Sequence, residues 1–260
     1  IQIPRLSGGI ISNLFWLTDE QMARLRPFFP KSHDKPRADD RRALSGIIFI
    51  NRNGLRWCDA PKEYGPPKTL YDRWKRWSEM GVLQDFEGLA AEATDPTTIM
   101  IDATYLKAHR TASSLRGKKG GRGRLIGRTK GGMNTKLHNI TDTNGRPIRL
   151  FISAGQTSDY TGAAALLATC RKPHGFWETA AVTPIGSPKP CKNGDQALHP
   201  GPDSAKEAIK YDKRHYKRRN RVEIMFGRLK DWRRVTTRYD RCPKVFLSAI
   251  ALAATVMFWL

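Results

Sequence analysis

The chain has 260 residues, of which 46 are Lys or Arg and 24 are Asp or Glu, so its net charge is +22. This length can bury the core of one large domain or two modest ones, and 39% hydrophobic residues exclude a wholly disordered chain. Because cations that neutralise phosphates release counterions, the surplus favours a polyanionic partner, nucleic acid before an anionic membrane, and disfavours small-molecule metabolism.

The cysteines and the N-terminal residues give information about the cellular compartment of the protein. The four cysteines form no C-x-x-C pair, which argues against a zinc module or a dense disulfide framework and favours a reducing cytoplasm. Residues 1–12 lack the continuous apolar stretch of a signal peptide. We expect them to form a leader outside any domain, and a chain that begins without Met to be a processed, truncated or over-extended translation.

Two helices are predicted in the first third of the chain. Thr18 is a typical cap residue, and the helix that follows it is expected to end before Pro30. Its apolar positions recur at helical spacing: Met22, Leu25 and Phe28. A second helix is expected over 41–53, with Gly54 placed to end it.

A third helix is predicted to begin at Thr69 and to run through the segment TLYDRWKRW. Leu70, Trp74 and Trp77 share one face, which leaves three basic residues for the exposed surface: Arg73, Lys75 and Arg76. Two interpretations stay open: a helix–turn–helix whose second helix contacts DNA through these residues, or a surface helix anchored by its tryptophans. Residues 13–92 are therefore predicted to be a small helical DNA-binding region.

The pattern changes to strand after this region. A short, partly β-branched run over 97–101 predicts a buried strand that ends on Asp102. A carboxylate there is costly unless it is paired, so either a metal ion or a salt bridge is expected beside Asp102.

A mixed α/β layout is predicted for the middle of the chain. Residues 116–132 are rich in Gly, Lys and Arg without any acid, which predicts a mobile loop that follows a phosphate backbone. Strands are expected over 136–141 and 149–154, joined by a hairpin at Asn144-Gly145, and a helix near 160–167.

A basic helix and an apolar helix are predicted near the end of the chain. Residues 210–244 hold 14 Lys or Arg and four acids, with Arg219, Glu223 and Lys230 near one helix face. Either Glu223 pairs with Arg219, for about 0.3 kcal/mol, or it is a metal ligand beside a DNA contact at Lys230. Residues 245–260 fall short of the roughly 20 apolar residues of a membrane span, so a buried helix is favoured over a membrane anchor.

The chain resembles a known family through several of these segments. Tyr216, Arg219, Glu223 and Lys230 match the signature Y-x2-R-x3-E-x6-K of the DDE transposases of bacterial insertion sequences. The runs LTDEQMARLRPFFP and DDRRALSGIIFINRNGLRWCDAPKEYGPPKTLYDRWKRW are similar to their N-terminal region, and IDATYLKAHRTA to the segment of their first catalytic aspartate. The resemblance covers about 12–168 and 208–260.

The resemblance implies an RNase H-like catalytic core with a mixed sheet over 97–260, preceded by the helical region. In such a core three acids bind two divalent cations, normally Mg²⁺, which activate the attacking oxygen and stabilise the leaving one. Asp102 and Glu223 would be catalytic metal ligands, and three further residues would support them and contact DNA: Tyr216, Arg219 and Lys230. The resemblance also implies that the partner is double-stranded DNA, namely terminal inverted repeats and target DNA, and that the protein forms a homo-oligomer on DNA. It further implies a nucleoid-associated cytoplasmic location and no membrane partner.

The family's third aspartate has no counterpart in the sequence. Residues 169–207 hold 6 of the 16 prolines and 2 of the 4 cysteines, without strand or helix periodicity. Because Trp177 has a single codon, reading one nucleotide earlier permits Leu-Gly-Asp-Arg-Gly, a family-like sequence, so we predict a frameshifted segment whose original frame resumes near Ala208. The alternative is a divergent insertion in which Asp195 or Asp203 replaces the lost ligand.

The sequence therefore predicts an insertion-sequence transposase that binds terminal inverted repeats and performs metal-dependent strand cleavage and transfer. This copy is expected to be catalytically impaired, with one carboxylate of its two-metal site lost. The alternative is a non-catalytic DNA-binding protein, a defective copy that occupies the ends of the element.

Overall fold

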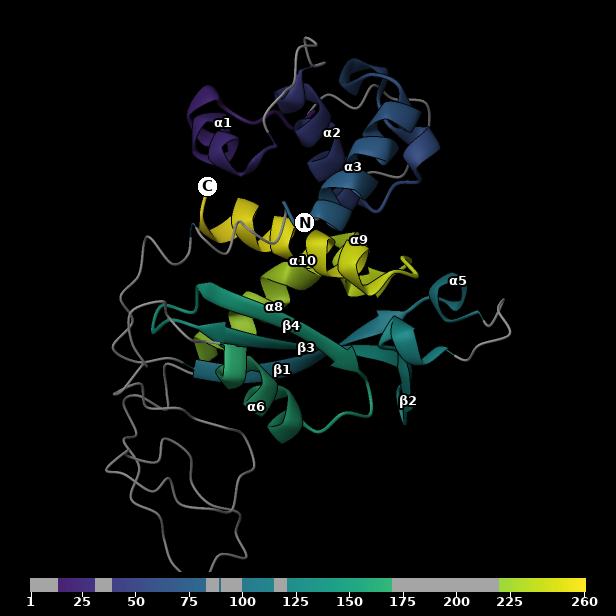
Figure 1. Cartoon of the computed structure of the whole chain (residues 1–260), viewed down its shortest axis with the longest axis vertical. Coiled ribbons are helices and arrows are strands. Elements are labelled where there is room, and N and C mark those ends of the chain that lie inside the picture. Colours follow the sequence, from purple (N-terminus) through teal and green to yellow (C-terminus); the bar gives the residue numbers. More distant parts are fainter. Residues whose placement is uncertain (1–13, 31–38, 83–88, 90–99, 115–120, 170–219) are drawn as a thin grey trace, which may run out of the picture.

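A five-stranded mixed sheet lies below a group of N-terminal helices in the computed structural model (Figure 1). The structure describes residues 14–30, 39–82, 89, 100–114, 121–169 and 220–260. The strands are β1 (Met100–Ala108), β2 (Gly127–Thr129), β3 (Gly132–Thr141), β4 (Pro147–Ala154) and β5 (Thr237–Arg238). Their order is β2-β3-β1-β5, with β4 also paired to β3, and the short β1–β5 pair is the parallel one.

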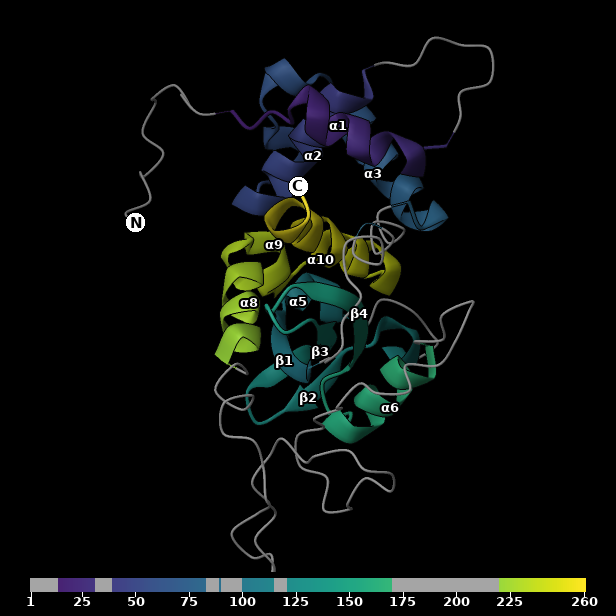
Figure 2. The ribbon, with the colours of Figure 1, turned by 90° about the vertical axis from the view of Figure 1, so that its left-hand side faces the viewer.

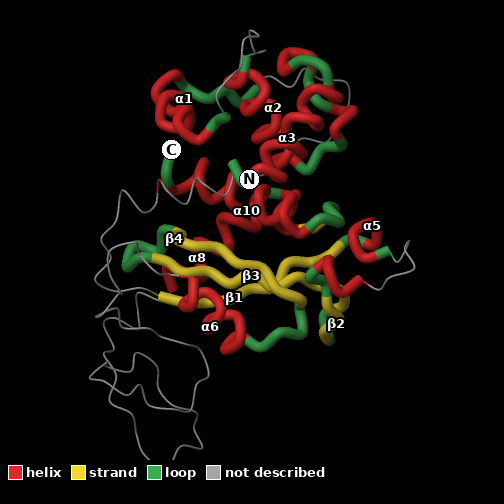
Figure 3. Tube along the Cα trace, in the orientation of Figure 1, coloured by secondary structure: helices red, strands yellow, loops and turns green. Residues whose placement is uncertain are grey.

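Helices lie on both faces of this sheet and above it (Figure 3). The α-helices are α1 (Asp19–Leu25), α2 (Asp40–Asn53), α3 (Pro67–Met80), α5 (Arg110–Ser113), α6 (Asp159–Thr169), α8 (Asn220–Asp231), α9 (Arg233–Thr236) and α10 (Pro243–Phe258). Short 3-10 segments occupy Arg26–Phe28, Trp57–Asp59, Lys62–Tyr64 and Gly121–Arg124. This arrangement confirms the predicted mixed α/β class with a helical N-terminal region.

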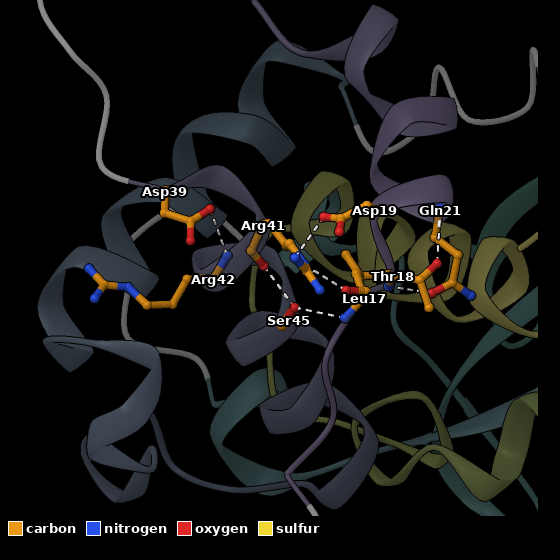
Figure 4. Close-up of polar contacts among 8 residues, drawn as sticks. All are labelled: Leu17, Thr18, Asp19, Gln21, Asp39, Arg41, Arg42 and Ser45. Atoms are coloured by element: carbon orange, nitrogen blue, oxygen red, sulfur yellow. Dashed lines mark hydrogen bonds and ion pairs between the residues drawn. The ribbon is translucent and has the colours of Figure 1, made fainter.

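The start of α1 has the predicted cap. Thr18 Oγ1 accepts a hydrogen bond from the Gln21 backbone N–H, and the Gln21 side chain accepts one from the Thr18 N–H (Figure 4). Ser45 of α2 accepts a hydrogen bond from the Leu17 N–H, and Arg41 of α2 pairs with Asp19 at 2.7 Å. These contacts fix α1 on α2. Helix α2 ends, as predicted, at a left-handed Gly54 with φ of 69°.

Helix α3 confirms its predicted apolar face but not its predicted basic one. Leu70, Trp74 and Trp77 are each 1% exposed, and the helix begins at Pro67, two residues before the predicted Thr69. The prediction that Arg73 lies on the exposed surface is wrong. Its side chain is only 10% exposed, because position 73 borders the apolar stripe and the guanidinium pairs with Asp40 of α2 and lies over the Trp77 ring. Lys75 and Arg76 are exposed, as predicted.

Strand β1 runs past the acid that was expected to end it. Each β1 residue from Met100 to Lys107 has a partner on β3, so the ladder continues five residues beyond Asp102. The prediction of a strand that ends on Asp102 is therefore wrong, since cross-strand hydrogen bonding to β3 keeps the chain extended and β1 ends only at Ala108. Residues 97–99 lie outside the described residues.

The basic, glycine-rich segment is partly ordered into the sheet. Gly127–Thr129 forms β2 and pairs with the start of β3, which corrects the prediction of a loop over all of 116–132; residues 115–120 lie outside the described part. The predicted hairpin at Asn144-Gly145 is confirmed, with φ of 78° at Gly145 and the turn closed by a hydrogen bond from its N–H to the Asp142 carbonyl. The predicted helix near 160–167 is α6.

The apolar C-terminal helix α10 lies between the N-terminal helices and the sheet (Figures 1 and 2). Its buried residues join those of α2, α3, β1, β3 and β4 in one continuous hydrophobic cluster. This confirms the prediction of a buried helix over 245–260. Among the described residues, no helix is long and apolar enough to cross a membrane. The predicted boundary between 92 and 97 lies outside the described residues.

Candidate active site

Asp102 lies in the middle of the sheet, on the face that helix α8 covers. Its cross-strand partner is Asn139 of β3, whose side-chain Nδ2 donates to Met225 Sδ of α8 at 3.5 Å. Thr104, two residues along β1 and hence on the same face as Asp102, accepts a hydrogen bond from Lys230 Nζ of α8 at 2.7 Å. The register therefore places the Asp102 side chain on the side of the sheet that faces α8.

Helix α8 runs along β1 in the same direction. At its start, Arg221 Nη1 donates to the Thr143 carbonyl at 3.1 Å, on the hairpin next to the Met100–Thr141 pair. Near its end Lys230 reaches Thr104. Nine helical residues span about 13.5 Å and four strand residues about 13 Å, so the two elements stay in register along this length.

Glu223 lies towards the Asp102 end of the segment along which α8 packs beside β1. It lies two residues after Arg221, which places it at the level of the first residues of β1. Seven residues separate it from Lys230, so the two side chains project about 20° apart around the helix, whereas Met225 projects about 140° from Lys230. Met225 leans towards β3 and Lys230 towards β1. Glu223 therefore projects on the β1 flank, the flank of Asp102, and its side chain is exposed.

Two of the predicted signature residues are not placed. Tyr216 and Arg219 lie outside the described residues, so the structure does not test the predicted face that Arg219 shares with Glu223. Lys230 is placed: burial lowers the pKa of its ammonium group, and Thr104 provides a hydrogen-bond acceptor for it. The contact with Thr104 was not predicted, although the period of two along a strand puts positions 102 and 104 on one face.

The polar residues between α8 and the sheet have the chemistry of a hard-cation site. Asp102 and Glu223 offer carboxylate oxygens, and Asn139 adds an amide oxygen that is buried and has no hydrogen-bond partner among the described residues. Carboxylate ligands of this kind suit Mg²⁺. Within the described ranges, no three His, Cys, Asp or Glu residues gather closely enough to bind a metal.

The opposite face of the sheet has a different, structural set of polar residues. His138 is buried beneath α6 and its Nε2 lies 2.8 Å from Ser153 Oγ, while burial lowers the pKa of its imidazole to about 4. On the same face Lys136 Nζ donates to Asp159 of α6 at 2.8 Å. Sequence reasoning did not single out these residues, since only the strand register shows that they face away from Asp102.

Known protein families match the chain in three consecutive segments. Residues 17–86 match a putative transposase of the IS4/5 family, and residues 93–183 and 170–260 each match a transposase DDE domain. The uncharacterized protein y4sN of Sinorhizobium fredii is 38% identical over 109 residues, which are 41% of this chain and 87% of that protein.

A second relative belongs to an insertion element. An uncharacterized 16.2 kDa protein of insertion element IS402 from Burkholderia cepacia is 29% identical over 109 residues, 35% of this chain and 73% of that protein. No solved structure matches the chain. The DDE-domain matches imply that the mixed sheet with its helices is an RNase H-like core.

Proposed function

The chain belongs to the DDE transposases of insertion sequences, enzymes that cleave and transfer DNA strands, and we propose that it acts on the terminal inverted repeats of its own element. In this proposal residues 13–92 bind the repeat, a core over 97–260 holds the catalytic acids, and copies of the chain assemble on DNA. Lys75 and Arg76, both exposed on α3, are the repeat contacts, and Arg73 is a structural residue.

The placement of α8 along β1 carries the catalytic part of the proposal. The contacts of Arg221 with the hairpin and of Lys230 with Thr104 hold both ends of the helix segment that bears Glu223. The segment therefore keeps Glu223 on the flank of Asp102. Asp102 is braced by its own strand, since the Ala103 N–H donates to its Oδ1 at 2.7 Å. Rigid elements of this kind suit a site whose ligands must stay within about 0.5 Å of their positions.

Asp102 and Glu223 would hold Mg²⁺, which in this chemistry activates the attacking oxygen and stabilises the leaving oxygen of a phosphodiester. The chain's own residues bind and orient the DNA around this point. The hydrogen bond to Thr104 keeps the Lys230 ammonium on the Asp102 face of β1, where it can contact a phosphate. Arg221 and Arg228, both exposed on α8, add positive charge to this helix.

The impairment of this copy is part of the proposal. The third acid of the family would come from 169–207, which we interpret as a frameshifted segment; residues 170–207 lie outside the described residues. Two observations support this interpretation. Reading one nucleotide earlier from the single codon of Trp177 permits Leu-Gly-Asp-Arg-Gly, a family-like sequence. Within the described residues, β1 is paired on the edge away from β3 only at Lys107 and Ala108.

A cleavage assay with the element's own terminal repeats tests the proposal. The chain as it stands is expected to bind repeat DNA, with affinity that falls steeply with salt, and to cleave it weakly or not at all with Mg²⁺. A version with the original reading frame restored across 169–207 is expected to cleave. In that version Asp102→Asn and Glu223→Gln should abolish cleavage and keep binding, whereas Asp231→Asn, an exposed acid on the same helix, should leave both intact.

Three outcomes would contradict parts of the proposal. Cleavage by the restored chain that survives Asp102→Asn would exclude the assigned site. Equal cleavage by the chain before and after restoration would exclude impairment and favour the divergent insertion with Asp195 or Asp203. Repeat binding without cleavage in both versions would favour the alternative function, a non-catalytic DNA-binding protein that occupies element ends.

A further inference from the structure

Asn139 has a buried oxygen that the fold of the described residues leaves without a hydrogen bond. The residue lies in the middle of β3, is 0% exposed, and donates from Nδ2 to Met225 Sδ, a weak acceptor, at 3.5 Å. Its Oδ1 has no hydrogen-bond partner among the described residues. A buried acceptor without a donor costs about 1–3 kcal/mol. An apolar residue of similar size would avoid this cost.

The register of the sheet puts this oxygen beside the first catalytic carboxylate. Asn139 is directly opposite Asp102 in the antiparallel pair of β1 and β3. Side chains of such a pair project from the same face with their Cβ atoms about 4.5–5.5 Å apart. Both side chains lie under α8, the helix that brings Glu223 to the same flank.

A carboxylate and an amide oxygen are both acceptors and cannot hydrogen-bond to each other. A hydrated cation held by Asp102 can supply the donor that the Asn139 oxygen lacks. Mg²⁺ keeps several of its water ligands, and each of these waters can donate to a nearby oxygen. Removal of a residue that hydrogen-bonds to the ligands of a metal typically changes the affinity for that metal by about 10–100-fold.

We propose that Asn139 is a positioning residue of the metal site, whose Oδ1 accepts a hydrogen bond from a water ligand of the cation held by Asp102 and Glu223. The inference rests on the proposed function, since it assumes that these acids bind the cation. In this role Asn139 acts on the cation through its water ligand and does not contact DNA directly. It also explains why the centre of β3 keeps a buried amide beside an extensive hydrophobic cluster that includes Leu137 and Ile152.

The test is metal binding by the full-length chain without DNA, measured as the loss of the free Mn²⁺ electron paramagnetic resonance signal. Asn139→Leu removes the acceptor and keeps the volume roughly constant, and it should weaken Mn²⁺ binding by about 10–100-fold. Asn139→Asp keeps an acceptor oxygen in the same place and should bind Mn²⁺ at least as tightly as the original chain. These two variants separate the acceptor role from simple occupancy of the space.

Asn51 provides a matched control. It too is 0% exposed with an Oδ1 that has no hydrogen-bond partner within the described ranges, but it lies in α2 of the N-terminal helices. Asn51→Leu should leave Mn²⁺ affinity unchanged. Thermal unfolding without metal serves as the folding control, in which Asn139→Leu should be as stable as the original chain or more so.

The outcomes distinguish this inference from the proposal on which it rests. If Asp102→Asn weakens Mn²⁺ binding and Asn139→Leu does not, the role of Asn139 is refuted and the metal site stands. If Asn139→Asp weakens binding as much as Asn139→Leu, the amide acts as a donor and the inference is also refuted. If Asp102→Asn itself has no effect on binding, the proposed metal site is wrong.

Discussion

Replacement of Arg73 by Met should lower the stability of the folded protein without weakening its contact with DNA. The guanidinium pairs with Asp40, and the side chains are 10% and 21% exposed, respectively. Removal of one partner of a buried ion pair costs about 3–5 kcal/mol. The N-terminus of α2 still stabilises the remaining Asp40 carboxylate by up to about 1 kcal/mol. Met keeps the apolar contact with Trp77, so we expect the free energy of unfolding to fall by about 2–4 kcal/mol.

Two measurements separate a structural Arg73 from a DNA contact. Urea denaturation followed by tryptophan fluorescence gives the free energy of unfolding. Fluorescence anisotropy with terminal-repeat DNA, repeated at several salt concentrations, gives the slope of log affinity against log salt. That slope changes by about 0.9 for each phosphate that the protein no longer neutralises. Arg73→Met should lower the free energy of unfolding and leave the salt slope of the folded protein unchanged.

Lys75→Ala is the control on the same helix. Lys75 lies 3.9 Å from Glu79, and both side chains are more than half exposed, so this pair contributes little to stability. The substitution should change the unfolding free energy by less than about 0.5 kcal/mol and reduce the salt slope by about 0.9. An Arg73→Met variant that keeps full stability and instead reduces the salt slope, as Lys75→Ala does, would refute a structural role for Arg73.

Three further predictions concern the scaffold. Because burial lowers the pKa of His138 from 6.5 to about 4, stability should be complete above pH 6.5 and decline by roughly 3 kcal/mol towards pH 4; His138→Gln should flatten that decline in urea titrations at each pH. Gly46→Ala would place a Cβ 2.6 Å from Tyr64 Cβ and should lower the free energy of unfolding by about 1–3 kcal/mol. Gly227→Ala, whose Cβ would have nothing within 4 Å, should raise it by about 0.5–1 kcal/mol. Equal shifts of the thermal unfolding midpoint in the two variants would contradict this. Trp259→Phe should lower stability by about 1–2 kcal/mol in the same denaturation assay through loss of the indole hydrogen bond to the Pro147 carbonyl, and an unchanged midpoint would argue against that bond.

The local elements follow closely from the sequence because their signals are local. Thr18 caps α1, Gly54 ends α2 in the left-handed conformation, and Asn144-Gly145 makes the hairpin, as the residue types predict. The burial of α10 follows from its uninterrupted apolar composition. Each of these features depends on a few residues that are near each other in the chain, so no tertiary information is needed.

Features that depend on register and packing were predicted incompletely or wrongly. The sequence marked Asp102 as the end of a strand, but pairing with β3 carries β1 on to Ala108. It marked Glu223 through a spacing motif, but only α8 and its contacts bring that flank to Asp102. Asn139 gave no signal at all, because its importance arises from a cross-strand partner 37 positions away along the chain.

The charge of +22 by itself favoured a polyanionic partner, because net charge is a sum over the whole chain and needs no structure. Which cations are available to that partner was decided by the tertiary structure. Arg73, Arg234 and Arg238 are 9%, 8% and 0% exposed and hold elements together, Arg234 through the Leu55 carbonyl and Arg238 through Thr135. Lys75, Arg76 and Arg228 remain exposed. The composition counts every charged residue equally. In the folded protein, a charged side chain that is buried and paired is no longer on the surface that DNA can reach.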